Sequence, residues 1–430
     1  MKEKLKEHHQ VLEEIVSDYV SGKFFELDLD EIFSSIKSSG DVWVLGAGKA
    51  SVAMARQAID YFKDKIKDGI IIAPEKSKEL HQIQVFKGSH PLPDNDTVSS
   101  SYELLNLARK IPKGDTVIFC LSGGASALFC IPAKGIELEE IRNCYELLLN
   151  SGASIHQINV VRKHLSETAG GRLGEVLSQT NLHSVILSDV PGDDPQSIGS
   201  APTIPDSSTF KEAFQILKQF KLWDHMPHSA RIHISKGMHG DVRENPGAGD
   251  QKWEHHSVNV ISGAKVLAEN ISKELRDRGW NVFIAEEAYD DDLKKVSKKI
   301  CSEAISVVSE DKPVSKPAAL IYFGESTVNV SGKGKGGRNQ EMALNAAISI
   351  EGQHSISLLS LGTDGMDGPT DAAGAIINSE TALLARKKKL NPEEYLQNND
   401  SYHFHEKMET LVKTGPTGNN LMDLQVVLVS

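Results

Sequence analysis

The chain has 430 residues, 39% of them hydrophobic and 25% charged, which is enough to build two or three hydrophobic cores. Its formal net charge of −12 argues against nucleic acid as the main partner. The sequence contains no apolar run long enough to span a membrane, so no membrane partner is expected either.

Residues 1–19 predict a charged amphipathic helix with four glutamates, Glu3, Glu7, Glu13 and Glu14. Such a segment suits neither a signal peptide nor an acid-poor transit peptide, and we expect a cytoplasmic protein. The chain has four cysteines and no C-x-x-C pair, so buried reduced thiols are expected rather than disulfides or a zinc site.

Strand-like and helix-like segments alternate along the chain, which is typical of parallel sheets covered by helices on both faces. Strands are predicted at residues 42–45, 69–72, 116–121, 184–187, 258–261, 282–285, 318–322, 327–330 and 355–361. Helices are predicted at residues 49–62, 98–108, 137–150, 155–165, 262–278, 293–308 and 338–348. The pattern is weakest at residues 225–252, where we expect a domain boundary or a mobile hinge.

The first predicted strand ends in a glycine loop, Gly46-Ala47-Gly48-Lys49-Ala50-Ser51. A strand, then glycines, then a helix leaves backbone N–H groups and a positive helix end where a phosphate can bind, and Lys49 would open the helix. The loop is not a P-loop, and Ser51 stands in the third glycine place of a dinucleotide fingerprint. A plain glycine turn in any Rossmann-like unit is the alternative interpretation.

Two polar loops follow later strands, at the edge where open α/β sheets bind ligands. The loop Ser122-Gly123-Gly124-Ala125-Ser126 could cap a helix or bind phosphate or carboxylate oxygens. The loop Ser188–Asp194 carries three carboxylates, which could hold Mg²⁺ or accept a proton from a substrate hydroxyl. An ordinary surface turn is the alternative for the second loop.

A second basic glycine loop, Ser331–Glu341, joins another predicted strand to another predicted helix. Glycine lets a backbone approach a ligand closely, and Lys333, Lys335 and Arg338 add charge-assisted contacts, so the loop is predicted to cradle an anion. The later loop Gly362–Asp371 again places carboxylates among glycines. The alternatives are an exposed basic turn for the first loop, and an Asx-turn or calcium site for the second.

Basic glycine loops together with acidic loops meet the needs of phosphoryl transfer. That reaction requires cations on the transferring phosphate, a metal held by carboxylates, and an oriented hydroxyl. The residues alone do not name the acceptor of the phosphoryl group.

At these loops the chain resembles the glycerate kinases that combine an N-terminal Rossmann-like region with a C-terminal MOFRL domain. The shared motifs follow one another along nearly the whole chain, at residues 46–50, 90–94, 122–128, 158–166, 188–194, 202–206, 332–341, 362–374 and 414–420. Ala125, Ala169, Ala201 and Phe323 depart from the family pattern.

The resemblance implies an α/β protein of two domains with the active site in the cleft between them. Residues 1–240 would form a Rossmann-like three-layer α/β/α domain with a mainly parallel sheet, and residues 250–430 a MOFRL α/β domain with a mixed sheet. The last residues, within Thr414–Ser430, could pack back on the first domain. The implied reaction is direct in-line transfer from ATP, with Mg²⁺, to D-glycerate, favouring the 2-phosphate, in a monomer or homodimer.

Residue chemistry and the resemblance together assign roles to individual positions. The expected catalytic residues are Lys49, Arg338 and Asp189, and Asp189 and Asp364 are also the candidate metal ligands. The expected substrate- and nucleotide-binding residues are Gly46, Gly48, Ser122, Gly123, Gly124, Ser126, Asp194, Gly334, Gly336, Gly337, Asn339 and Asp364.

Two other functions stay open at this point. The first is an NAD(P)H-dependent hydroxypyruvate reductase, suggested by Gly46-x-Gly48 and disfavoured by the incomplete fingerprint. The second is a non-catalytic relative that binds a nucleotide or a sugar acid, and the presence of Lys49, Asp189, Asp364 and Arg338 argues against it.

Overall fold

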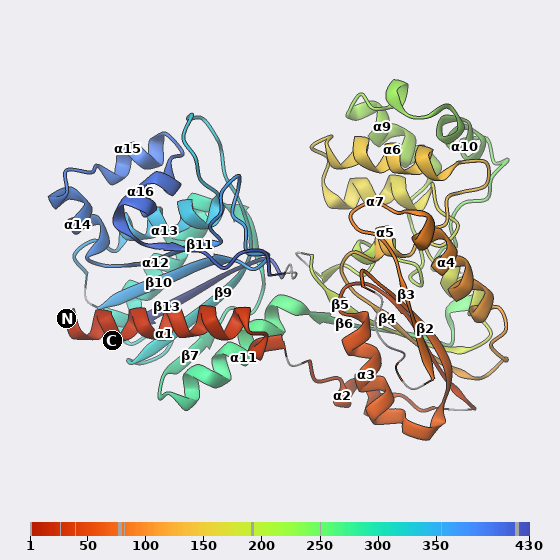
Figure 1. Ribbon diagram of the computed structural model, residues 1–430, viewed down its shortest axis with the longest axis horizontal. Helices are drawn as coiled ribbons and strands as arrows, with labels where there is room; N and C mark the ends of the chain where they lie inside the picture. Colours follow the sequence, from red (N-terminus) through yellow and green to blue (C-terminus); the bar gives the residue numbers. More distant parts are fainter. Residues whose placement is uncertain are drawn as a thin grey trace. The chain divides into compact units, whose positions relative to one another are not determined.

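The computed structural model divides the chain into two compact units (Figure 1). It describes residues 2–25, 27–38, 40–75, 80, 82–190, 193–249, 251–353, 355–417 and 421–430. Leu27–Ile261 forms one unit, called here the middle unit. Met1–Glu26 and Ser262–Ser430 together form the other, called the terminal unit. The units thus divide the chain at other residues than the expected ranges 1–240 and 250–430.

The middle unit is built on a six-stranded sheet in the order β3-β2-β1-β4-β5-β6. The strands are β1 (Val42–Ala47), β2 (Ile66–Ala73), β3 (Ile83–Lys87), β4 (Thr116–Leu121), β5 (Asn181–Ser188) and β6 (His256–Ser262). The pairs among β1 to β5 are all parallel, which confirms the mainly parallel sheet. Strand β3 was not predicted.

Helices cover both faces of this sheet, because its strands are apolar on both sides. In β1, Val42 and Val44 pack with α2 (Asp30–Ser35) and α3 (Ser51–Phe62). The alternate residues Trp43 and Leu45 pack on the other face, with α4 (Asn95–Ala108), α5 (Ala125–Leu128) and α8 (Arg172–Val176).

Four further helices of the middle unit share a hydrophobic cluster of their own. They are α6 (Leu138–Leu149), α7 (Ile155–Lys163), α9 (Phe210–Gln219) and α10 (His228–Met238). The expected boundary or hinge at 225–252 is wrong at α10, whose Ala230 and Ile234 are buried. Its apolar pattern is weak because His233 and Gly237 occupy other positions of the buried face.

The terminal unit is built on a seven-stranded sheet in the order β12-β11-β10-β13-β9-β7, with β8 paired to β9. The strands are β7 (Asn281–Ile284), β8 (Tyr289–Asp292), β9 (Ala318–Thr327), β10 (Ile356–Gly362), β11 (Gly374–Asn378), β12 (Leu411–Val412) and β13 (Asp423–Val429). β13 runs antiparallel to β9 and β10, and β7 and β8 run parallel to β9, so the predicted mixed sheet is confirmed. Residues 318–322 and 327–330 were predicted as two strands, but β9 runs from 318 to 327 and 328–330 are irregular.

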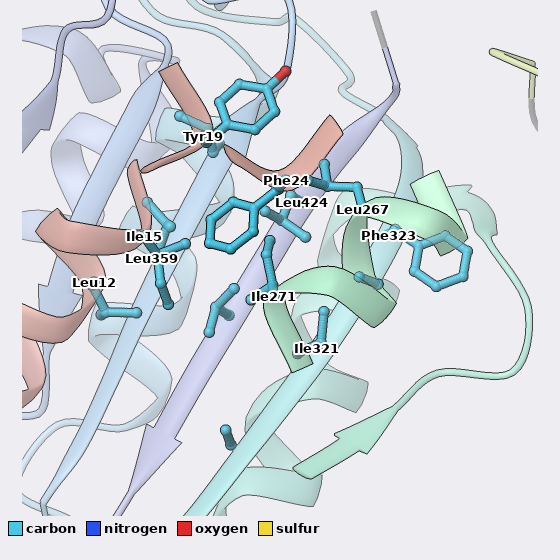
Figure 2. Close-up of a cluster of buried hydrophobic side chains, with 14 of the residues drawn as sticks. Leu12, Ile15, Tyr19, Phe24, Leu267, Ile271, Ile321, Phe323, Leu359 and Leu424 are labelled. Carbon is cyan, nitrogen blue, oxygen red and sulfur yellow. The ribbon is translucent and has the colours of Figure 1, made fainter. Parts of the chain in front are cut away.

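The amino-terminal helix α1 (Lys2–Val20) packs on one face of the terminal sheet with α11 (Gly263–Asp277). Figure 2 shows Leu12, Ile15 and Tyr19 of α1 in one cluster with Leu359 of β10 and Leu424 of β13. This apolar stripe explains why the first residues join the carboxy-terminal half. They were expected in the first domain, residues 1–240.

The opposite face of the terminal sheet is covered by α12 (Leu293–Glu310) and α13 (Arg338–Ser349). Three shorter helices complete the unit, α14 (Thr381–Lys387), α15 (Pro392–Gln397) and α16 (Ser401–Met408). No described helix, in either unit, has the length and apolar character needed to cross a membrane.

Candidate functional site

The loops that follow β1 and β4 are bound to each other at the centre of the middle sheet. β1 and β4 are neighbours, and the chain continues from them toward opposite edges, which makes this the switch point where open α/β sheets bind ligands. The N–H of Lys49 donates to the carbonyl of Gly123 at 3.0 Å, and the N–H of Ala50 donates to Ser122 Oγ at 2.9 Å. The structure therefore brings two of the predicted loops into one site.

Glycines let the groups of this site approach closely. Gly48 has a φ of 135°, and a Cβ at this position would overlap Ser122. A Cβ on Gly123 would overlap the carboxylate of Asp189, which follows β5. The predicted residues Gly48, Lys49, Ser122, Gly123 and Asp189 thus lie together, and Gly46 lies under them in β1 against the Cys120 carbonyl.

The acidic and the basic side chain of this site, Asp189 and Lys49, differ in burial and in exposure to solvent. Burial raises the pKa of Asp189, and the charge of Lys49 opposes that rise. The Lys49 side chain is exposed, and no acidic side chain in the described part of the chain forms an ion pair with it. Lys49 is thus available to an incoming anion, while Asp189 is held in a partly buried position that makes it more basic.

Ser126 and Asp194 are connected by a chain of hydrogen bonds. Ser126 Oγ lies 2.8 Å from Ser200 Oγ, which donates to Asn159 Oδ1 at 2.9 Å. Asn159 Nδ2 donates to the carbonyl of Ser197, whose Oγ donates to Asp194 Oδ2 at 2.8 Å. Asp194 therefore shapes the loop that supports Ser126. Pro191 and Gly192, of the predicted acidic loop, lie outside the described residues.

In the terminal unit, the backbone N–H groups in the first half of the basic glycine loop already donate hydrogen bonds to another part of the chain. The N–H groups of Ser331 and Gly332 donate to Asn399 Oδ1, and that of Lys335 donates to Asp400 Oδ1. The N–H groups of residues 333 and 334 bind Asn398 in the same turn. The expected open cradle is therefore wrong for residues 331–335, because the turn at 398–400 satisfies their amides.

Asp367 occupies the amino-terminal end of α13. Its carboxylate accepts the N–H groups of Asn339 at 3.0 Å and Gln340 at 2.8 Å. The backbone N–H groups of Gly336, Gly337 and Arg338 donate no hydrogen bond within the described part of the chain. The unoccupied donors of the loop are thus these three, directly beside Arg338.

Arg338 is held by two carboxylates. Its Nη1 lies 2.5 Å from Glu325 Oε1, and its Nε lies 2.6 Å from Asp423 Oδ2. Burial raises the pKa of Asp423 to about 7, against the attraction of Arg338. Asn339 is only 1% exposed and donates to Asp423 Oδ1, so it helps to hold this pair.

A pocket of about 660 Å³ opens between the glycine loop and the acidic loop after β10. Among its lining residues are the predicted Gly334, Gly336, Gly337, Arg338 and Asp364. Two motifs that are separate in the sequence thus border one cavity, together with the unpredicted Asp367.

The two candidate metal ligands belong to different units, Asp189 to the middle unit and Asp364 to the terminal unit. Within the described ranges, no group of three or more histidine, cysteine, aspartate or glutamate side chains is arranged to hold a metal ion. Asp364 Oδ1 accepts the N–H of Met366 at 3.0 Å, as in an Asx-turn.

Sequence reasoning missed three carboxylates, Glu325, Asp367 and Asp423. Asp367 lies within the loop Gly362–Asp371, which the sequence pattern singles out, so a signal for it was present. Glu325 and Asp423 carry no local signal, because only the pairing of β9 with β13 brings these two carboxylates together, and both then contact Arg338.

Comparison with known proteins gives the family of the chain. A domain family of unknown function, DUF4147, matches residues 7–235, and the MOFRL family matches residues 318–423. A D-glycerate 2-kinase of Thermotoga maritima is 37% identical over 90% of this chain and 90% of its own. A glycerate 2-kinase of Pyrococcus horikoshii is 36% identical over 96% of this chain and 90% of its own.

A solved structure and more distant relatives complete the comparison. The crystal structure of a glycerate kinase from Thermotoga maritima has a TM-score of 0.81 and 35% identity, covering 99% of this chain and 100% of the other. A relative from Agrobacterium vitis that carries hydroxypyruvate reductase in its name is 32% identical over 90% of this chain and 86% of its own. The chain therefore belongs to the family of MOFRL-domain glycerate kinases.

Proposed function

We propose that this protein transfers the terminal phosphoryl group of ATP to D-glycerate, by direct in-line attack of the 2-hydroxyl, to give 2-phospho-D-glycerate. The relatives named as glycerate 2-kinases support the reaction and the position. The observation that carries the proposal is that an exposed cation, Lys49, and a partly buried carboxylate, Asp189, lie in the same group of loops at the switch point of the middle sheet. A kinase needs those two groups at its acceptor site.

Asp189 is the proposed group that orients the acceptor hydroxyl and takes its proton. A carboxylate with a raised pKa is a better proton acceptor than an ordinary one at neutral pH. Its contact with Gly123 fixes its direction. Lys49 is the proposed cation that neutralises charge on the transferring phosphoryl group.

The pocket beside Arg338 is the proposed place for the nucleotide. The amides of Gly336 and Gly337 and the guanidinium of Arg338 offer donors to phosphate oxygens. Mg²⁺ commonly binds through one or two carboxylates and the substrate phosphates, and Asp364, which lines this pocket, has the oxygens for it. The metal would neutralise phosphate charge, and Asp364 would orient it.

A cytoplasmic location and a monomeric or homodimeric state belong to the same proposal. The reductase remains the second candidate, because a relative carries that name. Ser51 in the third glycine place of the fingerprint speaks against a bound dinucleotide.

One pair of assays tests the proposal. ADP release is measured with ATP, Mg²⁺ and D-glycerate, and NADH oxidation is measured in parallel with hydroxypyruvate. We expect glycerate-dependent ADP formation, with phosphorus NMR of the product showing the 2-phosphate. Lys49→Ala should lower the rate by at least about 100-fold, by loss of a transition-state contact, while Lys65→Ala, at an exposed lysine of the same unit, should not. NADH oxidation without ADP formation would replace the kinase by the reductase.

A further inference from the structure

Helix α7 ends in two consecutive buried cations, and in the described part of the chain only one of them has an acidic partner. Lys163 is 1% exposed and forms an ion pair with Asp206, at 3.2 Å. Arg162 is 7% exposed and has no carboxylate partner in the described part of the chain. Its Nε atom is buried without any hydrogen-bond partner, and its guanidinium lies 4.5 Å from the ring centre of Tyr145.

An unpaired buried guanidinium is unfavourable. The desolvation of an ion is repaid only by a well-placed counter-charge or by hydrogen bonds, and one aromatic face compensates only part of it. Burial accordingly lowers the pKa of Arg162. The neighbouring Lys163 is balanced by Asp206, whereas Arg162 has no such partner in the described residues, and an anion from outside the chain would balance it.

The surroundings of Arg162 place that anion beside the loop after β4. Asn159 lies one helical turn earlier on α7, on the same side as Arg162, and its hydrogen bond to Ser200 leads to Ser126. The ring of His90 lies against Gly124, where an added Cβ would be 3.1 Å from His90 Cδ2. Burial and then the charges of Lys49 and Arg162 lower the pKa of His90, so both cations act on this one ring.

We propose that Arg162 forms, with the loop Ser122–Ser126, a buried oxyanion subsite that binds the carboxylate of the acid substrate. This rests on the proposed function and names the group that selects an acid as acceptor. A planar guanidinium matches a carboxylate with two parallel hydrogen bonds. A single negative charge balances Arg162, whereas a triphosphate would leave several unbalanced charges in a buried place.

The test compares Arg162→Met with Arg142→Met, at a partly exposed arginine on α6 of the same unit. Melting temperature is measured without ligand and with D-glycerate, a non-hydrolysable ATP analogue, both together, or inorganic phosphate, and KM is measured for each substrate. We expect Arg162→Met to melt at or above the wild-type temperature and to lose stabilisation by D-glycerate. KM for glycerate should rise roughly 10- to 100-fold, the loss of a charge-assisted hydrogen bond, and KM for ATP should stay unchanged. Arg142→Met should behave as wild type.

Three results would overturn the subsite. One is a lower melting temperature with an unchanged response to glycerate, which would make Arg162 purely structural. Another is loss of the response to phosphate or to the ATP analogue alone, which would make it a phosphate group ligand. The third is a wild type that D-glycerate does not stabilise, with or without the ATP analogue. If the wild type binds glycerate through Arg162 but forms no ADP, the subsite stands and the proposed kinase reaction falls.

Discussion

The buried ion pair between Lys163 and Asp206 offers a sharp test of how the middle unit is held together. Replacing Lys163 with methionine keeps the size of the side chain and removes its charge. Burial alone would raise the pKa of Asp206, but Lys163 and the hydrogen bonds from Ser208 and Asn245 outweigh it and hold that pKa below its ordinary value. The substitution leaves a carboxylate with those hydrogen bonds and no cation.

The size of the effect follows from the geometry. At the 3.2 Å separation of the pair, an effective dielectric constant of about 20 corresponds to an attraction of about 5 kcal/mol. Removal of one partner of a buried pair costs about 3–5 kcal/mol. Asp206 keeps the N–H of Ser208 at 3.0 Å and the amide of Asn245 at 2.8 Å, so we expect the lower end, about 3 kcal/mol.

Urea unfolding and hydrogen exchange of the α7 amides measure this loss at pH 7. Because the folded pKa of Asp206 is depressed, its stabilising contribution is present above about pH 4 and is lost as the pH falls through the folded pKa. The deficit of Lys163→Met should therefore shrink in acid. Addition of Asp206→Asn should restore most of the stability. A loss below about 1 kcal/mol in the single variant at pH 7 would refute the view that the pair is both buried and charged.

Four further predictions concern the terminal unit and the proposed catalytic cations. Lys49→Ala and Arg338→Ala should both reduce kcat/KM. Only Arg338→Ala should also lower the free energy of unfolding, by about 3 kcal/mol, because it leaves Asp423 buried without a cation. Equal melting temperatures of the two variants would contradict this. Asp423 has a pKa raised to about 7, so its contribution to stability falls as pH rises from about 4 and is lost above about 7, and Asp423→Asn should flatten that slope in thermal unfolding. Asp367→Ala should cost about 1–3 kcal/mol and speed hydrogen exchange at the start of α13, whose two amides lose their acceptor. Ile15→Ala should cost about 2–5 kcal/mol in urea unfolding of the terminal unit, because this side chain is fully buried; an unchanged stability would mean that α1 does not need the sheet.

Sequence reasoning succeeded where chemistry is local. The segments at 42–45 and 116–121 are continuous apolar runs, which is the pattern of strands buried on both faces, and the structure places β1 and β4 there. The polar loops behind them, with Lys49 and Ser122, were predicted as site loops, and the parallel pairing brings their ends together.

Sequence reasoning failed where a partner comes from far along the chain. The amides of Ser331 and Gly332 are satisfied by Asn399, and no property of the glycine loop indicates this. β13, the strand between β9 and β10, was not predicted as a strand, although Asp423–Val429 is largely apolar. Its position depends on two antiparallel pairings that only the folded sheet defines.

The two units differ in how they balance the charges of their loops, and this difference bears on what each can bind. In the middle unit, Lys49 and Arg162 have no acidic partner in the described part of the chain, so an anion there gains attraction without displacing a carboxylate. In the terminal unit, Arg338 already binds Glu325 and Asp423, and an anion must share that guanidinium with them. A phosphate at Arg338 therefore depends on backbone donors or an accompanying cation, whereas a small acid at Arg162 needs no additional cation. The charge balance thus supports binding of the acid in the middle unit, whereas a nucleotide in the terminal unit would need its charge compensated by the free amides of Gly336 and Gly337 or by an accompanying cation.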